Sequence, residues 1–256
     1  AVIRALGAFG LGVARLTGAL ALVLARTTLN LPRLDRRELF RSIVLFGYRS
    51  LPLALMAATL IGSTVVLQAG VYAVKFGARL YTGWAAGYAL TREFGPLLLG
   101  LVMAARIGAR NAAELALLNV NGQIEGLRGI SLDPFRILVA PRVVGSAIAI
   151  TCLGSVTFLV AVCFEAVSSY FSLGLPLRVF FDSYQDMLRV GDLVGGLTKT
   201  LAFGLAIALV STVAGLRAKG GAVGVGQAAA SAVVLSCAAI FSLDLLLTPF
   251  LTRLFG

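Results

Sequence analysis

Histidine is absent from all 256 residues of the sequence. It is the usual general base of nucleophilic triads and the commonest metal ligand, so its absence excludes His-dependent catalysis and every His-ligated metal site. The three cysteines, Cys152, Cys163 and Cys237, lie far apart in apolar runs. We expect them to be small buried hydrophobic side chains, and we predict neither a disulfide framework nor a metal site.

Charged residues are also scarce, at 13% of the chain against 59% hydrophobic residues, and the mean hydropathy is +0.96. Soluble domains are less apolar than this, so a lipid bilayer is the expected solvent. The 22 Lys and Arg residues exceed the 11 Asp and Glu residues. They lie mainly between apolar runs and without the aromatic residues of nucleic-acid-binding surfaces. We therefore expect lipid headgroups, and no nucleic acid, as their partners.

Apolar runs of about 20 residues are long enough to span a membrane as helices. Four such runs carry no charge: residues 51–74, 143–164, 200–216 and 227–243. A fifth run, residues 84–105, contains Arg92-Glu93 and then Gly95-Pro96, which predicts a helix that is deformed inside the membrane. The fold class predicted is an all-α membrane protein of one domain over residues 1–256, with five transmembrane helices in residues 42–256.

Residues 1–41 are predicted to form an N-terminal interfacial helix and a linker. Arg4, Arg15 and Arg26 interrupt the apolar sequence, and neither stretch between them is long enough to span a bilayer. Their spacing of 11 places all three on one face of a helix, with about 20° of drift per step. This pattern favours a helix in the membrane plane with its arginines toward headgroups. The alternative is an ordinary amphipathic helix packed on the bundle.

The distribution of Lys and Arg predicts the orientation. Fifteen lie in the N-terminal region and in the connections on its side, and five lie on the other side. This bias predicts a cytoplasmic N-terminus and an outer C-terminus. Residues 110–133, between the second and third spans, are predicted to form a cytoplasmic amphipathic helix. Residues 174–191, between the third and fourth spans, are predicted to form a short outer helix that starts at Pro176.

Five charged residues fall inside or at the ends of the predicted spans: Arg92, Glu93, Glu165, Lys199 and Asp244. Each would cost about 2.5–3.5 kcal/mol if it faced lipid, so each is expected to face an interior, a cavity or a partner. They either pair with one another to fix the helices or contact a lipid headgroup. Glu165 ends its run, and we expect it to reach the outer interface.

No motif for nucleotide hydrolysis is present. The P-loop pattern requires a Gly-Lys dipeptide, and the sequence contains none. The glycine-rich residues 220–226 are predicted to form a flexible cytoplasmic turn into the last span. Any energy for transport would therefore come from another subunit.

Several short motifs, taken together and in this order, resemble those of the MlaE/YrbE permeases, which are the membrane subunits of ABC lipid transporters linked to MCE proteins. The motifs that carry the resemblance are residues 92–96, 105–109, 113–115, 123–127, 133–134, 141–142, 196–200, 203–204, 220–226 and 232–234, then Asp244 and residues 247–248.

The resemblance implies a homodimeric permease in the bacterial inner membrane. Its partners would be a second copy of the chain, two cytoplasmic P-loop ATPase subunits and a periplasmic MCE-domain protein, and its cargo would be a lipid. The chain itself would be neither catalytic nor cofactor-binding, because ATP and Mg would be held by the ATPase.

The resemblance also assigns a coupling helix that seats in the ATPase. The coupling residues it implies are Glu114, Gln123, Glu125, Leu127 and Arg128. The family commonly has Glu-Gln-Ile-Asp-Ala-Leu here, whereas this chain has Gly122, Glu125 and Gly126 at the differing positions. The two glycines are expected to loosen the helix by about 1 kcal/mol each.

For the substrate site, Arg92 and Lys199 would offer positive charge to a phosphate or carboxylate headgroup, while Glu93 and Asp244 would position those cations. Two other functions compete. A secondary transporter or channel for an amphipathic anion would also use buried charges. An intramembrane lipid enzyme would need a nucleophile paired with a base, which the sequence does not offer.

Overall fold

The computed structural model describes the backbone of residues 2–255, and the side chains in this range other than those of residues 2–9, 13, 33 and 255. All regular structure in this part of the chain is helical, as the sequence predicts. The α-helices are α1 (Val2–Asn30), α2 (Arg36–Gly47), α3 (Leu51–Lys75), α4 (Thr82–Ala89), α5 (Gly95–Met103), α6 (Ala109–Val120), α7 (Gln123–Gly129), α8 (Ala140–Leu173), α9 (Leu177–Met187), α10 (Val190–Leu216) and α11 (Gly221–Phe255).

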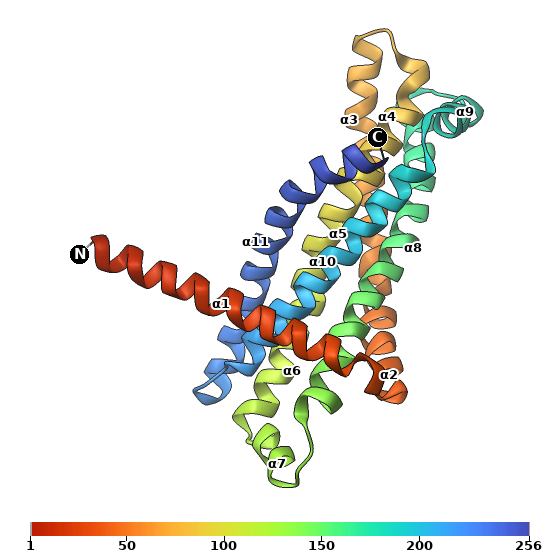
Figure 1. Ribbon diagram of the computed structural model, residues 1–256. Helices are drawn as coiled ribbons and strands as arrows, with labels where there is room; N and C mark the ends of the chain where they lie inside the picture. Colours follow the sequence, from red (N-terminus) through yellow and green to blue (C-terminus); the bar gives the residue numbers. More distant parts are fainter. Residues whose placement is uncertain (1, 256) are drawn as a thin grey trace.

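The long helices run side by side in one elongated bundle (Figure 1). Helix α8 packs against α2, α3 and α10, while α10 packs also against α6 and α11. Helix α9 lies at one end of the bundle and α7 at the opposite end (Figure 1). The two ends are called the α9 end and the α7 end below.

Helices α4, α5 and α6 follow one another as a single rod that is interrupted by two π-helical segments, Leu90–Phe94 and Ala104–Gly108. The first segment contains the charged pair of the second predicted span and directly precedes Gly95 and Pro96. A Cβ atom at Gly95 would lie 2.5 Å from the carbonyl oxygen of Leu90, so the wide turn requires glycine here. The predicted deformation of this helix is confirmed.

Five helical stretches among the described residues are long and apolar enough to cross a membrane: Gly10–Asn30, Arg36–Lys75, Phe135–Leu173, Val190–Leu216 and Gly221–Leu254. The number agrees with the prediction, but the membership differs. The second predicted span, residues 84–105, is not among them, and it is the predicted span that carries the charged pair Arg92-Glu93 in its interior. The N-terminal stretch is included by length and composition although Arg15 and Arg26 lie within it, and the interfacial position of this helix stays a prediction.

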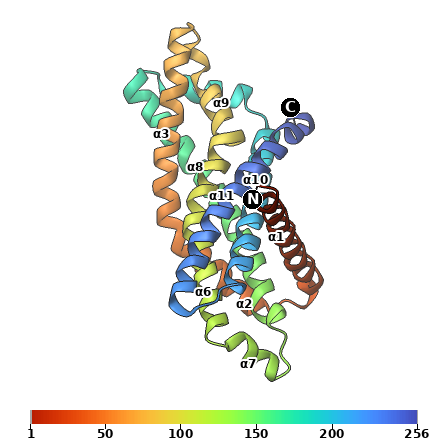
Figure 2. The ribbon, with the colours of Figure 1, turned by 90° about the vertical axis from the view of Figure 1, so that its left-hand side faces the viewer.

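Helix α1 is continuous and crosses the bundle obliquely (Figures 1 and 2). One of its faces packs on the bundle, with Val23 buried beside residues of α8 and α10. The guanidinium group of Arg26 lies 4.7 Å from the centre of the Phe135 ring. The side chain of Arg217 donates a hydrogen bond of 2.9 Å to the carbonyl oxygen of Arg15. The Arg4 side chain lies outside the described residues.

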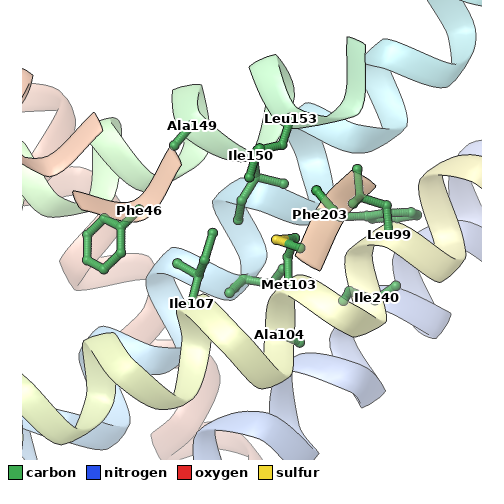
Figure 3. Packing of buried hydrophobic residues seen from close by; sticks show 12 residues of the cluster. Phe46, Leu99, Met103, Ala104, Ile107, Ala149, Ile150, Leu153, Phe203 and Ile240 are labelled. Atoms are coloured by element: carbon green, nitrogen blue, oxygen red, sulfur yellow. The ribbon is translucent and has the colours of Figure 1, made fainter. Parts of the chain in front are cut away.

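A cluster of buried apolar side chains fills the middle of the bundle (Figure 3). Leu99, Met103 and Phe203 are completely buried there, between α5, α8 and α10. Small residues bring the helices close together around this core, as is typical of membrane bundles. A Cβ atom at Gly62 of α3, for example, would lie 2.3 Å from the carbonyl oxygen of Ala161 on α8.

Of the two predicted connecting helices, the structure contains the outer one as predicted but not the other. The outer connection contains α9, which begins directly after Pro176, as predicted. The prediction of a single amphipathic helix within residues 110–133 was wrong. Helix α6 continues the second span to Val120, and α7 starts again at Gln123. Gly122 separates them with a φ of +70°, a left-handed conformation that ends the first helix.

The glycine-rich residues 220–226 form a shorter turn than predicted. Gly220 and Gly221 have φ values of +88° and +68° and make the turn between α10 and α11. The remaining glycines of this stretch lie inside α11, which starts at Gly221.

Replacing Gly62 by alanine should destabilise the bundle. The added methyl group would overlap the backbone of Ala161, and overpacking of this kind costs about 1–3 kcal/mol. We expect a lower Tm for G62A in detergent. The matched control is Gly226→Ala in α11, where an added Cβ atom meets nothing within 4 Å. A G62A protein as stable as G226A would show that the two helices separate without cost.

Candidate functional site

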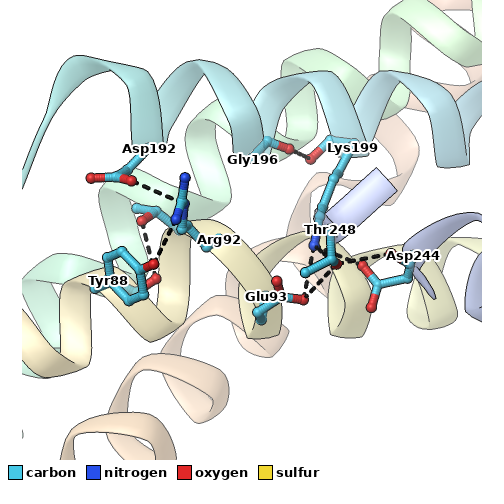
Figure 4. A network of polar contacts seen from close by, with 10 residues as sticks. Tyr88, Arg92, Glu93, Asp192, Gly196, Lys199, Asp244 and Thr248 are labelled. Atoms are coloured by element: carbon cyan, nitrogen blue, oxygen red, sulfur yellow. Dashed lines mark hydrogen bonds and ion pairs between the residues drawn. The ribbon is translucent and has the colours of Figure 1, made fainter. Parts of the chain in front are cut away.

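Lys199 is the centre of a buried ion cluster that joins three segments of the chain (Figure 4). Its Nζ atom lies 2.8 Å from Glu93 Oε2 in the first π-helical segment and 2.9 Å from Asp244 Oδ1 on α11. It also donates a hydrogen bond of 2.8 Å to the hydroxyl of Thr248, one turn beyond Asp244. The Lys199 side chain is only 3% exposed. A cation buried to this extent is stable only with such partners.

Arg92 points away from this cluster and makes its own contacts (Figure 4). Its Nε atom lies 3.0 Å from Asp192 Oδ1 at the start of α10. It also donates a hydrogen bond to the hydroxyl of Tyr88 and lies 5.0 Å from the centre of that ring. The other carboxylate oxygen of Asp192 accepts the backbone N–H of Arg189, which caps α10.

The structure therefore brings together three of the four predicted substrate-site residues, Glu93, Lys199 and Asp244, and places Arg92 in a separate ion pair. Sequence reasoning missed Asp192 because it lay outside the apolar run. A signal was present, however. Asp192 and Lys199 are seven residues apart, so they share one face of α10.

Gly196 lies between these two residues on α10 and sets how closely that helix approaches the rod. A Cβ atom at Gly196 would lie 2.1 Å from the carbonyl oxygen of Thr91. Thr91 is followed directly by the Arg92-Glu93 pair. The same close backbone contact thus positions both ion pairs.

The charges of the Lys199 cluster are unequal, because two carboxylates surround one ammonium group. Glu93 is the most accessible member, with 38% of its side chain exposed against 17% for Asp244. The cluster is therefore reached from the Glu93 side. Arg92 instead lines a pocket of about 440 Å³, together with Trp84 and residues of α9 and α10.

Glu165 does not reach the surface as expected. Its side chain is fully buried, and neither carboxylate oxygen has a hydrogen-bond partner among the described residues. Burial, together with the charge of Glu165, raises the pKa of Tyr184 on α9 to about 12.

The predicted coupling residues fall into two groups. Glu114 of α6 forms ion pairs with Arg110, at 2.8 Å, and with Arg142 of α8, at 3.0 Å. It therefore fastens two helices of this chain to each other. The other predicted coupling residues belong to α7, where Gln123, Glu125 and Arg128 are exposed and Leu127 is half-buried.

A bundle of long apolar helices with ion pairs buried between them is typical of integral membrane proteins, where buried charges mark candidate substrate or ion sites. A sequence model described as Permease MlaE matches residues 39–250, and the chain belongs to this family of permeases.

Relatives of the chain carry consistent names. A probable ABC transporter permease protein of Rickettsia typhi is 32% identical over 235 residues, which is 92% of this chain and 91% of the relative. A similarly named protein of Synechocystis is 32% identical over 82% of this chain and 80% of its own length. The chloroplastic protein TRIGALACTOSYLDIACYLGLYCEROL 1 of Arabidopsis thaliana is 33% identical over 80% of this chain and 58% of its own length.

Replacing Lys199 by methionine should destabilise the protein strongly, because it leaves two carboxylates facing each other without a cation. Breaking a buried ion pair from one side costs about 3–5 kcal/mol. We expect a large drop in the free energy of unfolding for K199M. The triple variant K199M/E93Q/D244N, which removes all three charges, should recover most of it.

Denaturant unfolding in detergent measures both effects. The matched control is Lys75→Met at the exposed end of α3, which should change little. A triple variant as unstable as K199M would mean that lost packing, and not unpaired charge, causes the destabilisation.

Proposed function

We propose that this chain is the permease subunit of an ABC transporter that moves phospholipid or a related lipid between the bacterial inner membrane and a periplasmic MCE protein. Family membership and the names of the relatives support an ABC permease. The Arabidopsis relative is named for a glycerolipid, which supports a lipid as the cargo. The excess of Lys and Arg on one side supports a cytoplasmic N-terminus and a periplasmic C-terminus.

The observation that carries the proposal is the position of the Lys199 cluster beside an exposed apolar face of α11. Among the side chains of this face, Phe241, Leu245 and Phe250 are 54%, 77% and 62% exposed. Asp244 and Thr248 lie on the same helix and belong to the cluster. We propose that a second copy of the chain covers this face, and that lipid enters a cavity between the two copies.

The cluster as it stands is closed, because Lys199 is already neutralised by two carboxylates. A phosphate or carboxylate headgroup would therefore have to replace Glu93 or Asp244 as a partner of Lys199. Glu93 is the partner with the greater exposure, and it belongs to a π-helical segment, a backbone feature that is frequent at functional sites. We propose that movement of this segment exposes Lys199 to the headgroup. Arg92, held by Asp192, would contribute from its separate pocket.

The energy would come from two P-loop ATPase subunits that hold ATP and Mg. Helix α7 offers Gln123, Glu125 and Arg128 at its end of the bundle, and no ion pair joins Glu125 or Arg128 to another described side chain. We propose that these side chains contact the ATPase. Glu114 would act indirectly, by fixing α6 to α8.

Exchanging the charges of α7 should separate the ATPase from the permease. The variant E125K/R128E keeps the net charge of the chain. Each of the two side chains would, however, face a charge of its own sign on the ATPase. We expect loss of ATPase co-purification and of ATP turnover by the complex.

The matched control is R178E/D182K on α9, at the opposite end of the bundle. It exchanges the charges of one exposed ion pair, in which the side chain of Arg178 is 92% exposed and that of Asp182 is 64% exposed. This control should retain the ATPase. Normal co-purification and turnover with E125K/R128E would contradict the docking role of α7. Absence of any P-loop ATPase from the wild-type preparation would contradict the proposed function and favour an ion-coupled carrier.

A further inference from the structure

A groove runs between α10 and α11 beneath the N-terminal helix, away from the Lys199 cluster. Its inner part is a pocket of about 440 Å³ that is almost entirely apolar. Leu20 and Leu24 of α1 form one wall, and Leu205 and Leu209 of α10 form another. Ser242 of α11 is the one polar residue that lines this part of the described structure.

A second pocket, of about 480 Å³, adjoins the first toward the α7 end. The two share Val210, and Leu16 lines the second pocket one helical turn before Leu20. Unlike the first, the second pocket is polar at its mouth, where Arg217 and Lys219 lie beside Gln227 and Ser231 of α11. The groove therefore changes along its length from an apolar channel to a basic opening.

The basic opening lacks a counter-charge among the described residues. No acidic side chain lines either pocket among the described residues, and none forms an ion pair with Arg217 or Lys219. Arg217 donates its hydrogen bond to a backbone carbonyl of α1 and is exposed. A small third pocket on the other side of α1 is lined by Arg217 and also by Arg26. Arg217 thus lies between two pockets, one lined also by Lys219 and the other by Arg26, and no acidic residue lines either pocket among the described residues.

We propose that this groove binds one phospholipid with an anionic headgroup, taken from the surrounding bilayer. Its acyl chain lies between α1 and the α10–α11 pair, and its phosphate lies between Arg217 and Lys219. The apolar and basic parts of the groove match the two parts of such a molecule, and the missing counter-charge is supplied by the phosphate. A polypeptide in the same place would need to bring its own acidic residue next to an apolar segment.

This lipid is distinct from transported cargo. Lys199 and Arg217 are 18 residues apart on α10, which is about 27 Å along a helix. The bound lipid holds α1 against α10 and α11 and remains in place during transport. The proposal does not depend on the proposed function, since a carrier of another class with this structure would bind the same lipid.

Photo-crosslinking tests the location. The full chain, with any subunits that co-purify, is placed in nanodiscs of equal parts phosphatidylcholine and phosphatidylglycerol, with a diazirine on the acyl chain of the latter. We expect crosslinks in residues 16–24, 202–210 and 235–243. Crosslinks confined to other surfaces, or crosslinks within the groove to a second polypeptide, would overturn the proposal.

Native mass spectrometry of lipid retained by the same complex tests the headgroup. Each basic side chain near an anionic lipid contributes about a fivefold preference, so R217Q/K219Q should lower the preference for phosphatidylglycerol by about 25-fold. The matched control R36Q/R37Q, at exposed positions at the start of α2, should leave it unchanged. An unchanged preference in a folded R217Q/K219Q protein would overturn the proposal.

A larger side chain in the apolar part of the groove tests whether an acyl chain binds there. Ala206 lines this part of the groove, and A206F should remove the retained lipid whatever its headgroup. The control A25F, at an exposed position of α1, should keep it. Retention of the lipid by A206F, with an unaltered Tm, would also overturn the proposal. Because transport is not measured in any of these experiments, a failure of the proposed function would leave their results unchanged.

Discussion

The neutralisation of Lys199 is the constraint on which the arrangement of the helices depends. An ammonium group that is 3% exposed in an apolar bundle needs carboxylates within contact distance. Glu93 and Asp244 come from segments about 150 residues apart in the sequence, and each meets Lys199 at less than 3 Å. The three helical segments can therefore separate or slide only if the cluster rearranges. A movement that opens the bundle at this place must change the partners of Lys199. The motion of the helices is therefore linked to the charge of any molecule that enters there.

Two local features of the backbone make this cluster possible. The π-helical segment Leu90–Phe94 widens the rod where Arg92 and Glu93 emerge, so the neighbouring side chains reach two different partners on α10 and α11. Gly196 then lets α10 approach Thr91 more closely than a side chain would allow. Without the wide turn, Arg92 and Glu93 would point in other directions. Without the glycine, α10 would lie farther from the rod. Irregular backbone and a small residue together provide what a regular helix pair could not.

The sequence predicted the all-α class, the deformed second rod and an interior position for Lys199, Glu93 and Asp244, with mutual pairing as one of two alternatives, because the cost of charge in lipid limits where such residues can lie. It did not identify Asp192, which follows the end of an apolar run and looked like a loop residue. It also joined α6 and α7 into one helix, because hydrophobic periodicity continues across Gly122 while the backbone does not. Glu165 was expected at the surface for a similar reason: the end of an apolar run does not reveal whether another helix, here α9, covers it.

Two cations of very different environment lie on or next to α10: Lys199 in its first half and Arg217 directly after its last residue. The hydrocarbon core is about 30 Å thick, and the 18 residues between Lys199 and Arg217 cover about 27 Å. Lys199 and Arg217 therefore cannot both lie at the middle of the hydrocarbon core. The two cations differ in their partners among the described residues: Lys199 has two carboxylates and is covered, whereas Arg217 is exposed and donates to a backbone carbonyl of α1.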